Sequence, residues 1–302
     1  MSDPHRSHLP LEILDSIIDL LYDRPEILKQ CCLVSKLWVP RTRKYLFADI
    51  NILTSGDLEA WKKAFPDPSR SPAHHTHTLT IACAPAIMPA GAEEDGWIQT
   101  FSSVVSLALD TSQYSGESEI SFTPFHQFST SLRSLRVTST LLPQSQVFDL
   151  IHSLPLLEDL ALDGRHVWAS NDDEFDGPPT VLPSTSPTFT GTLELILRQG
   201  GTGIVRQLLD LLNGLHFRKL KLLWREEEDF RWIVQLVVAC SDTLEHVDIT
   251  RNLNGAVYYV CFPAGSAIYL NFHPQTSSCY QVRSTSPERR NSKTSHSGSV
   301  CH

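Results

Sequence analysis

Residues 9–50 read LPLEILDSIIDLLYDRPEILKQCCLVSKLWVPRTRKYLFADI, and this stretch decides what is expected of the whole chain. Pro10 suits the first turn of a helix, where its missing N–H costs nothing. The pattern predicts that this helix covers residues 11–21. Its apolar positions span about half of the helix circumference, which is wider than contact with one neighbouring helix requires. They are Leu11, Ile13, Leu14, Ile17, Ile18, Leu20 and Leu21.

Two further helices are predicted in the same stretch. Asp23 followed by Glu26 is similar to a capping box, and Pro25 fits the first turn of the second helix. The third helix carries Trp38, and Pro40 either kinks it or restarts it. Three helices in about 40 residues are at the lower limit of independent stability. The apolar excess therefore indicates that the rest of the chain or a partner completes the core.

The order of these residues resembles an F-box, the helical module that docks on the Skp adaptor of a cullin–RING ubiquitin ligase. The run from Cys32 to Trp38 is similar to the C-x-V-S-K-x-W string of these modules, and Leu46-Phe47 follows. The resemblance covers residues 9–50 and implies an F-box protein of the fungal type, with a leucine-rich-repeat-like region after the F-box. A three-helix capping domain without an adaptor is the alternative. The residues that the resemblance implies for Skp binding are Leu9, Pro10, Glu12, Ile13, Leu14, Ile17, Leu28, Cys31, Val34 and Trp38.

Composition limits the classes of partner. The net charge of −9 and the lack of a basic stripe argue against a nucleic-acid binder. The local basic residues Arg41, Arg43 and Lys44 fit a solvated helix face. The seven cysteines are odd in number and contain no C-x-x-C, which fits reduced thiols in the cytoplasm or nucleus. The apolar run at 232–240 is too short to cross a bilayer, so no membrane association is expected.

A repeat begins near residue 76. Short strand-like pieces recur as L-x-x-L-x-L, at intervals of 28, 28, 25, 35, 25 and 27 residues between their central positions. Leucine-rich repeats have a period of about 20–29 residues. Amphipathic helices are predicted between the strands at 143–154, 203–215 and 229–239. The central positions are Leu79, Leu107, Leu135, Leu160, Leu195, Leu220 and Val247.

We therefore predict an α/β fold, in which a three-helix F-box is followed by an irregular leucine-rich-repeat-like α/β solenoid and a disordered C-terminal tail. Short strands and the lack of a Gly-rich phosphate loop disfavour a doubly wound sheet. The acidic, Pro-rich insertion at 163–190 fits a partner-binding loop and a plain exposed loop equally well. The boundaries are a flexible N-terminus at 1–8, the F-box at 9–50, a helical linker at 51–75, the repeats at 76–250, a terminal hairpin at 251–272 and the tail at 273–302.

Catalytic motifs are weak throughout. His74, His75 and His77 cluster without the paired ligand groups that are typical of zinc sites. The acidic run at 172–176 lacks the Gly and the terminal Glu of a calcium loop, and the glycines at 200–203 lack a following Lys-Ser/Thr. We expect no enzyme activity, no cofactor and no metal. An α/β hydrolase or transferase would need a nucleophile or phosphate motif that the sequence does not contain.

The resemblance and the repeats together imply a non-catalytic substrate-recognition subunit of an SCF-type ubiquitin ligase. The F-box would bind the Skp adaptor, and through it a cullin, while the repeats would hold a protein substrate. A leucine-rich-repeat scaffold that acts outside a ubiquitin ligase is the alternative.

Overall fold

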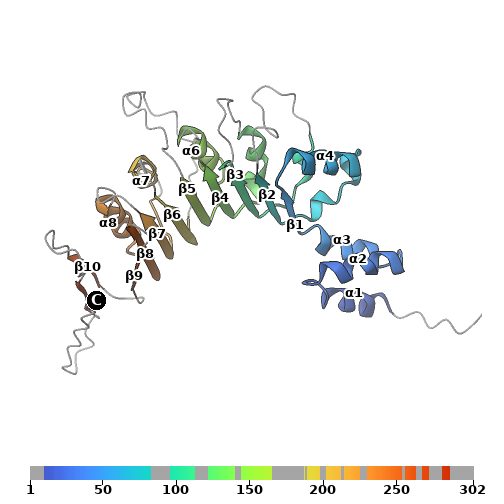
Figure 1. The fold of residues 1–302 in the computed structure, drawn as a ribbon, viewed down its shortest axis with the longest axis horizontal. Helices are drawn as coiled ribbons and strands as arrows, with labels where there is room; N and C mark the ends of the chain where they lie inside the picture. Colours follow the sequence, from blue (N-terminus) through green and yellow to red (C-terminus); the bar gives the residue numbers. More distant parts are fainter. Residues whose placement is uncertain are drawn as a thin grey trace, which may run out of the picture. The chain divides into compact units, whose positions relative to one another are not determined.

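The structure is a computed structural model with mixed α/β secondary structure, and its helices and strands alternate along the chain (Figure 1). It forms two compact units, Met1–Arg136 and Val137–His302. The described residues are 10–82, 96–112, 122–139, 144–164, 187, 189–197, 202–211, 214–224, 230–253, 256–262, 267–271 and 281–285. Leu9, most of the insertion at 163–190 and most of the tail at 273–302 lie outside them.

The first unit begins with three α-helices. They are followed by alternating strands and short helices, and β4 crosses into the second unit. The bounds are α1 Leu11–Asp19, α2 Pro25–Val34, α3 Val39–Leu46, β1 Asp49–Ile52, α4 Ser55–Ala64, η1 Pro68–Arg70, η2 Pro72–His75, β2 Thr78–Ala82, η3 Ile98–Thr100, β3 Ser106–Asp110, η4 Thr123–Thr130 and β4 Ser134–Ser139.

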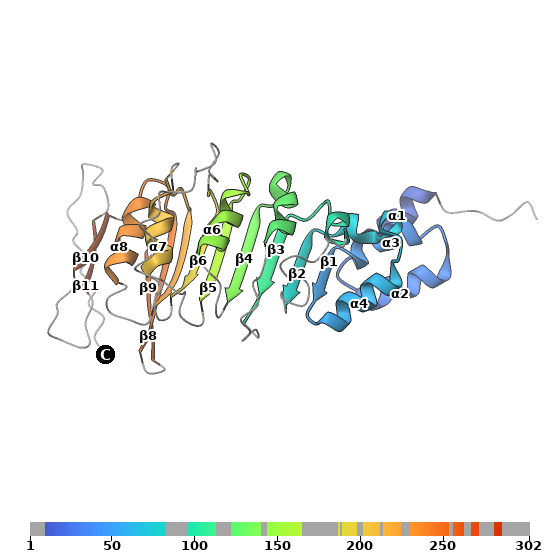
Figure 2. The ribbon, with the colours of Figure 1, turned by 90° about the horizontal axis from the view of Figure 1, so that it is seen from above.

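The second unit continues with parallel strands and longer helices. Figures 1 and 2 show α6, α7 and α8 on one side of the strands β5 to β8, whereas helices cover both faces of a doubly wound sheet. The bounds are α6 Gln144–His152, β5 Asp159–Gly164, β6 Thr192–Ile196, α7 Thr202–Leu209, β7 Lys219–Trp224, α8 Phe230–Ala239, β8 His246–Leu253, β9 Ala256–Phe262, β10 Ala267–Asn271 and β11 Gln281–Thr285.

The strands β1 to β8 form a parallel sheet in the order of the sequence. Alternate side chains are buried, as in Leu79 and Ile81 of β2 and Leu107 and Leu109 of β3. This period of two explains why apolar residues at alternate positions form strands with one buried face. The strand β9 pairs antiparallel with β8, and β10 pairs antiparallel with β11.

A hydrogen-bond pattern recurs at the start of the parallel strands. One backbone carbonyl accepts from two successive N–H groups of the next strand segment; for example, Ala48 O accepts from His77 N at 2.8 Å and Thr78 N at 3.0 Å. The spacing from one acceptor to the next is 29 residues from 48 to 77, 28 from 77 to 105 and 27 from 191 to 218. The backbone therefore repeats with the period that the leucines indicate. The acceptors are Ala48, His77, Val105, Gly191 and Arg218.

The predicted phase of the repeat is wrong in one strand. The structure pairs Leu160 with Leu193, and Leu193 with Leu220, so Leu193 takes the central position that we assigned to Leu195. Leu193, Leu195 and Leu197 are all buried and lie two residues apart. A shift of two residues leaves the same face buried, so the apolar pattern alone does not fix the register.

Three further predictions differ from the structure at their boundaries. The strand β1 pairs parallel with β2, so the sheet begins inside the predicted F-box and the linker at 51–75 is not wholly helical. The strand β1 is only four residues long and buries one side chain, Ile52. So short an apolar pattern is a weak indication of a strand in the sequence. The two strands of the predicted hairpin at 251–272 do not pair with each other. Instead β9 pairs with β8, and β10 pairs with β11, which lies in the predicted disordered tail. The second helix has Arg24 rather than Asp23 at its N-cap, with no side-chain cap hydrogen bond.

Candidate functional site: an apolar surface on the N-terminal helices

The helices α1, α2 and α3 share a small core. Ile18, Leu28 and Cys31 are buried at its centre. Four partly buried side chains pack around them; they are Leu21, Trp38, Tyr45 and Leu46. The two large buried side chains, Ile18 and Leu28, supply roughly 3–6 kcal/mol of hydrophobic stabilisation, at about 1.5–3 kcal/mol each.

An ion pair links the first helix to the third. Arg41 Nε donates to Asp19 Oδ1 at 2.6 Å, and Arg41 Nη2 donates to Asp19 Oδ2. Tyr45 Oη donates to Asp19 Oδ1 at 2.7 Å. These hydrogen bonds, first from Arg41 and then from Tyr45, lower the pKa of the Asp19 carboxyl from 3.8 to about 2. A bidentate guanidinium–carboxylate pair fixes geometry as well as charge, so it sets the position of α1 on α3.

Thr42 forms a second polar contact in the same helices. Its side chain is buried, and its hydroxyl donates to Trp38 O at 2.8 Å in the first turn of α3. The Sγ atom of Cys32 lies 2.8 Å from the same hydroxyl. Pro40 occupies the first turn of α3, which begins at Val39, so Trp38 is the N-cap residue and lies outside the helix in which we predicted it.

A row of apolar side chains on α1 faces away from this core. Ile13, Ile17 and Leu20 are exposed and follow one another at spacings of four and three residues. That spacing places them along one face of a helix. Leu14, Ile18 and Leu21 form the neighbouring row, which is half-buried or buried. The wide apolar arc of α1 therefore consists of one packed row and one unpacked row.

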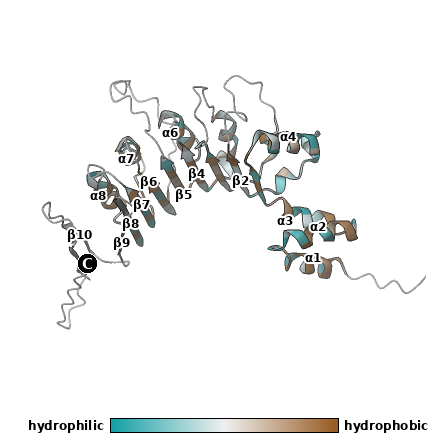
Figure 3. Ribbon diagram, in the orientation of Figure 1, coloured by the Kyte–Doolittle hydropathy of each residue, from teal (hydrophilic) through white to brown (hydrophobic). Residues whose placement is uncertain are grey.

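The unpacked apolar surface extends over the next two segments. Leu33 is 88% exposed, Val34 70% and Leu37 63%. Figure 3 shows that hydrophobic residues occur on each of the helices α1, α2 and α3. The exposed large apolar side chains of these helices and their connections are Leu11, Ile13, Ile17, Leu20, Tyr22, Ile27, Leu33, Val34 and Leu37.

The structure separates the residues predicted for adaptor binding. Pro10, Glu12, Ile13, Ile17 and Val34 are exposed, whereas Leu14 and Trp38 are half-buried. Leu28 and Cys31 are buried and pack the core of the helices. The sequence pattern does not distinguish buried from exposed apolar residues, so it left open which members of the predicted set pack this core. Leu9 lies outside the described residues.

Several exposed apolar residues are not in the set that the sequence predicted to bind the adaptor. Leu20 is 80% exposed, and Leu33 exceeds every other large apolar side chain reported as exposed. The signal was present, because Leu20 continues the row of Ile13 and Ile17. Leu20 also matches the F-box pattern, but the set predicted to bind the adaptor does not contain it.

Aromatic side chains connect α3 to the first strands within the same unit. Phe47, at the C-cap of α3, has its ring centroid 6.0 Å from that of Trp61 on α4 and 5.9 Å from that of Phe65 at the C-cap of α4. Trp61 in turn contacts Phe101 at 5.5 Å, and Phe101 contacts Trp97 at 5.8 Å. This chain of rings joins the end of the helices to the segment before β3.

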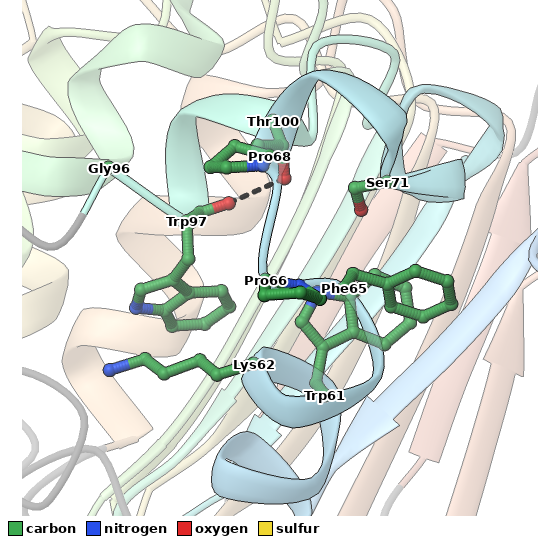
Figure 4. Close-up of a pocket in the computed structure, with 9 residues that line it drawn as sticks. All are labelled: Trp61, Lys62, Phe65, Pro66, Pro68, Ser71, Gly96, Trp97 and Thr100. Carbon is green, nitrogen blue, oxygen red and sulfur yellow. Dashed lines mark hydrogen bonds between the residues drawn. The ribbon is translucent and has the colours of Figure 1, made fainter.

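A cavity of about 250 Å³ lies beside these rings, between α4 and the segments around η1 and η3 (Figure 4). Trp61, Phe65 and Trp97 supply its aromatic walls, and Pro66 and Pro68 lie between them. Thr100 donates its hydroxyl hydrogen to Trp97 O at 2.6 Å, which holds the η3 side of the cavity.

Within residues 10–82 and the other described ranges, no group of three or more His, Cys, Asp and Glu side chains could hold a metal ion. No helix of the described residues is both long and apolar enough to span a bilayer. The acidic run at 172–176 and the glycines at 200 and 201 lie outside the described residues.

Comparison with known proteins adds no relative. No family model matches the chain, and neither a curated protein nor a solved structure matches it.

Proposed function

We propose that this chain is the substrate-recognition subunit of an SCF-type cullin–RING ubiquitin ligase. In this proposal α1 to α3 dock on a Skp-family adaptor, and the strands and helices after them hold a protein substrate. The observation that carries the proposal is the exposed apolar row on α1, together with Leu33, Val34 and Leu37 of the F-box-like string.

The physical role of such a subunit is to bring two proteins together. It would hold the substrate beside the catalytic subunits, which raises its effective concentration and orients it for transfer. The covalent chemistry belongs to the other subunits, which agrees with the weak catalytic motifs of this sequence. The aromatic chain from Phe47 to Trp97 supports the proposal, because it makes α3 continuous with the start of the sheet.

The test is direct binding of the purified full chain to a recombinant Skp-family adaptor. The double variant Ile13→Ala/Ile17→Ala removes the centre of the exposed row. We expect it to bind at least tenfold more weakly, which corresponds to a loss of about 1.4 kcal/mol or more. The matched control is Leu53→Ala/Val238→Ala, which removes two exposed apolar side chains outside the helical module. The control should bind within twofold of the unchanged chain.

The second arm of the test is affinity purification of the tagged full chain with the proteasome inhibited. Adaptor and cullin should co-purify with the chain and be lost with Ile13→Ala/Ile17→Ala. A chain that binds no Skp-family adaptor in either assay would overturn the proposal and favour a repeat scaffold outside the ligase.

A further inference from the structure

A second surface of the first unit is basic rather than apolar. The last turn of α3 carries Arg43 and Lys44, and both side chains are exposed. The short helix η2 packs against α3 and contributes His74 and His75, and His77 follows directly. Five basic side chains from two neighbouring segments thus gather in a chain whose net charge is −9.

The histidines of this surface are held in defined positions. The rings of His74 and His75 lie 3.9 Å apart between centroids. His74 Nδ1 lies 3.0 Å from Ser71 O, and His77 Nδ1 lies 2.7 Å from His75 O. Carbonyl oxygens accept only, so Nδ1 carries the hydrogen in both rings. The Nε2 atoms are then acceptors in the neutral rings and additional donors in the protonated ones.

The charges around His75 all have the same sign. Burial lowers its pKa first, and the nearby His74, Lys44, His77 and Arg43 lower it further. Asp49, which opens β1 and pairs in register with Thr78, is the acidic residue nearest to His77 on the neighbouring strand. It is not among the groups that shift His75. The carboxylate of Asp19 attracts Lys44, but it is already bound by Arg41, so positive charge stays in excess on this surface.

This environment does not suit a metal ion. A cation would meet the positive charges of Arg43 and Lys44, and no suitable ligand group occurs among the described residues. An anion would be attracted to this surface, because guanidinium, ammonium and imidazolium groups all donate charge-assisted hydrogen bonds.

We propose that the basic surface formed by Arg43, Lys44, His74, His75 and His77 binds an acidic peptide segment of a partner protein. A short peptide fits better than a nucleic acid, because the net charge of −9 repels an extended polyanion whereas a short segment meets the basic surface alone. Binding strengthens as the pH falls, since an acidic ligand favours the protonated, positively charged form of the histidines that it contacts. The inference does not depend on the proposed ligase function.

The test measures fluorescence anisotropy of a labelled ten-residue poly-glutamate peptide with the full chain. A poly-glutamine peptide of the same length is the uncharged probe. We expect binding about tenfold tighter at pH 5.5 than at pH 7.5, and weaker binding as salt screens the charges. The variants Arg43→Gln/Lys44→Gln and His74→Gln/His77→Gln change exposed residues only. Each should lose at least fivefold in affinity at pH 5.5, and the histidine variant should also lose most of the pH dependence.

The matched control is Lys36→Gln/Lys63→Gln, which removes two exposed positive charges outside this surface. It should bind the acidic peptide within twofold of the unchanged chain. Equal binding of poly-glutamine, an equal loss in the control or binding unchanged by both test variants would each overturn the inference. Tighter binding of a ten-nucleotide single-stranded DNA than of poly-glutamate would also overturn it.

Discussion

Arg41 on α3 holds the carboxylate of Asp19 at the end of α1 through two hydrogen bonds, and Tyr45 donates a third. Asp19 and Arg41 are 22 positions apart in the sequence, so their contact forms only when the first helix packs on the third. This ion pair is the main polar connection described between these helices, and the exposed apolar row of α1 depends on it for its orientation.

Replacement of Arg41 by Gln should raise the pKa of Asp19 from about 2 toward 3.8. The folded value is depressed, so ionised Asp19 stabilises the packing of α1 on α3 above about pH 4, and the contribution disappears as the pH falls toward 2. Carboxyl-carbon NMR titration of the full chain measures the shift. Asp57 is the internal control, because its pKa is lowered by hydrogen bonds from Thr54 and Leu53 instead. An Asp19 titration unchanged by the substitution would show that Arg41 does not contact it in solution.

The sequence predicted α1, α2 and α4 and the alternation of strands and helices, because both depend on local periodicity. It did not predict the short helices η1 to η4. It did not predict the pairing of Asp19 with Arg41, since a surface ion pair has no periodic signature. It also did not divide the apolar residues of α1 and α2 between the core and the surface. Leu28 and Leu33 are both leucines in one helix, and only the placement of α3 distinguishes them.

Truncation of Leu28 should destabilise the helices, whereas truncation of Leu33 should leave their stability nearly unchanged. Leu28 is 1% exposed, so Leu28→Ala should cost about 2–5 kcal/mol of local stability through lost burial and the cavity left behind. Leu33→Ala should change stability by less than about 0.5 kcal/mol. Amide hydrogen exchange of residues 11–46 in the full chain measures both, with Leu53→Ala as a second exposed control. Comparable protection in the two leucine variants would contradict the assignment of core and surface.

The reactivity of the Cys240 thiol should show whether the second unit is folded. Burial raises the pKa of its thiol to about 12, so almost no thiolate is present at pH 8. Iodoacetamide should therefore leave Cys240 unmodified in the folded chain and modify it in denaturant, as measured by peptide mass spectrometry.

A change in the buried core should expose this thiol. Phe217 is buried against Phe189, with ring centroids 4.9 Å apart, and Phe217→Ala should cost about 3–5 kcal/mol. Labelling of Cys240 should then become measurable without denaturant. Leu156→Ala, at an exposed position of the same unit, should leave the labelling rate unchanged. Rapid labelling of the unchanged chain would show that Cys240 is accessible.

Substitution of Gly191 tests the register between β5 and β6. Its N–H donates to Glu158 O at 3.1 Å, and a Cβ atom there would lie 2.3 Å from Asp159 Oδ1 and 3.0 Å from Glu158 O. Gly191→Ala should therefore destabilise the second unit by about 1–3 kcal/mol, as overpacking does elsewhere. The matched control is Gly56→Ala in α4, where the nearest atom would be 3.6 Å away. That substitution should be neutral or stabilising by up to about 1 kcal/mol.

A second substitution separates this contact from a general effect of the glycine. Asp159→Ala removes the closer of the two obstructing groups, so the double variant Gly191→Ala/Asp159→Ala should lose less stability than the sum of the single variants. The recovery should be partial, because the Glu158 carbonyl remains 3.0 Å from the added carbon. Hydrogen exchange at Leu193 and Leu195 measures the local effect. Strict additivity would place Gly191 away from Asp159, and with it the pairing of Leu160 with Leu193 would be wrong.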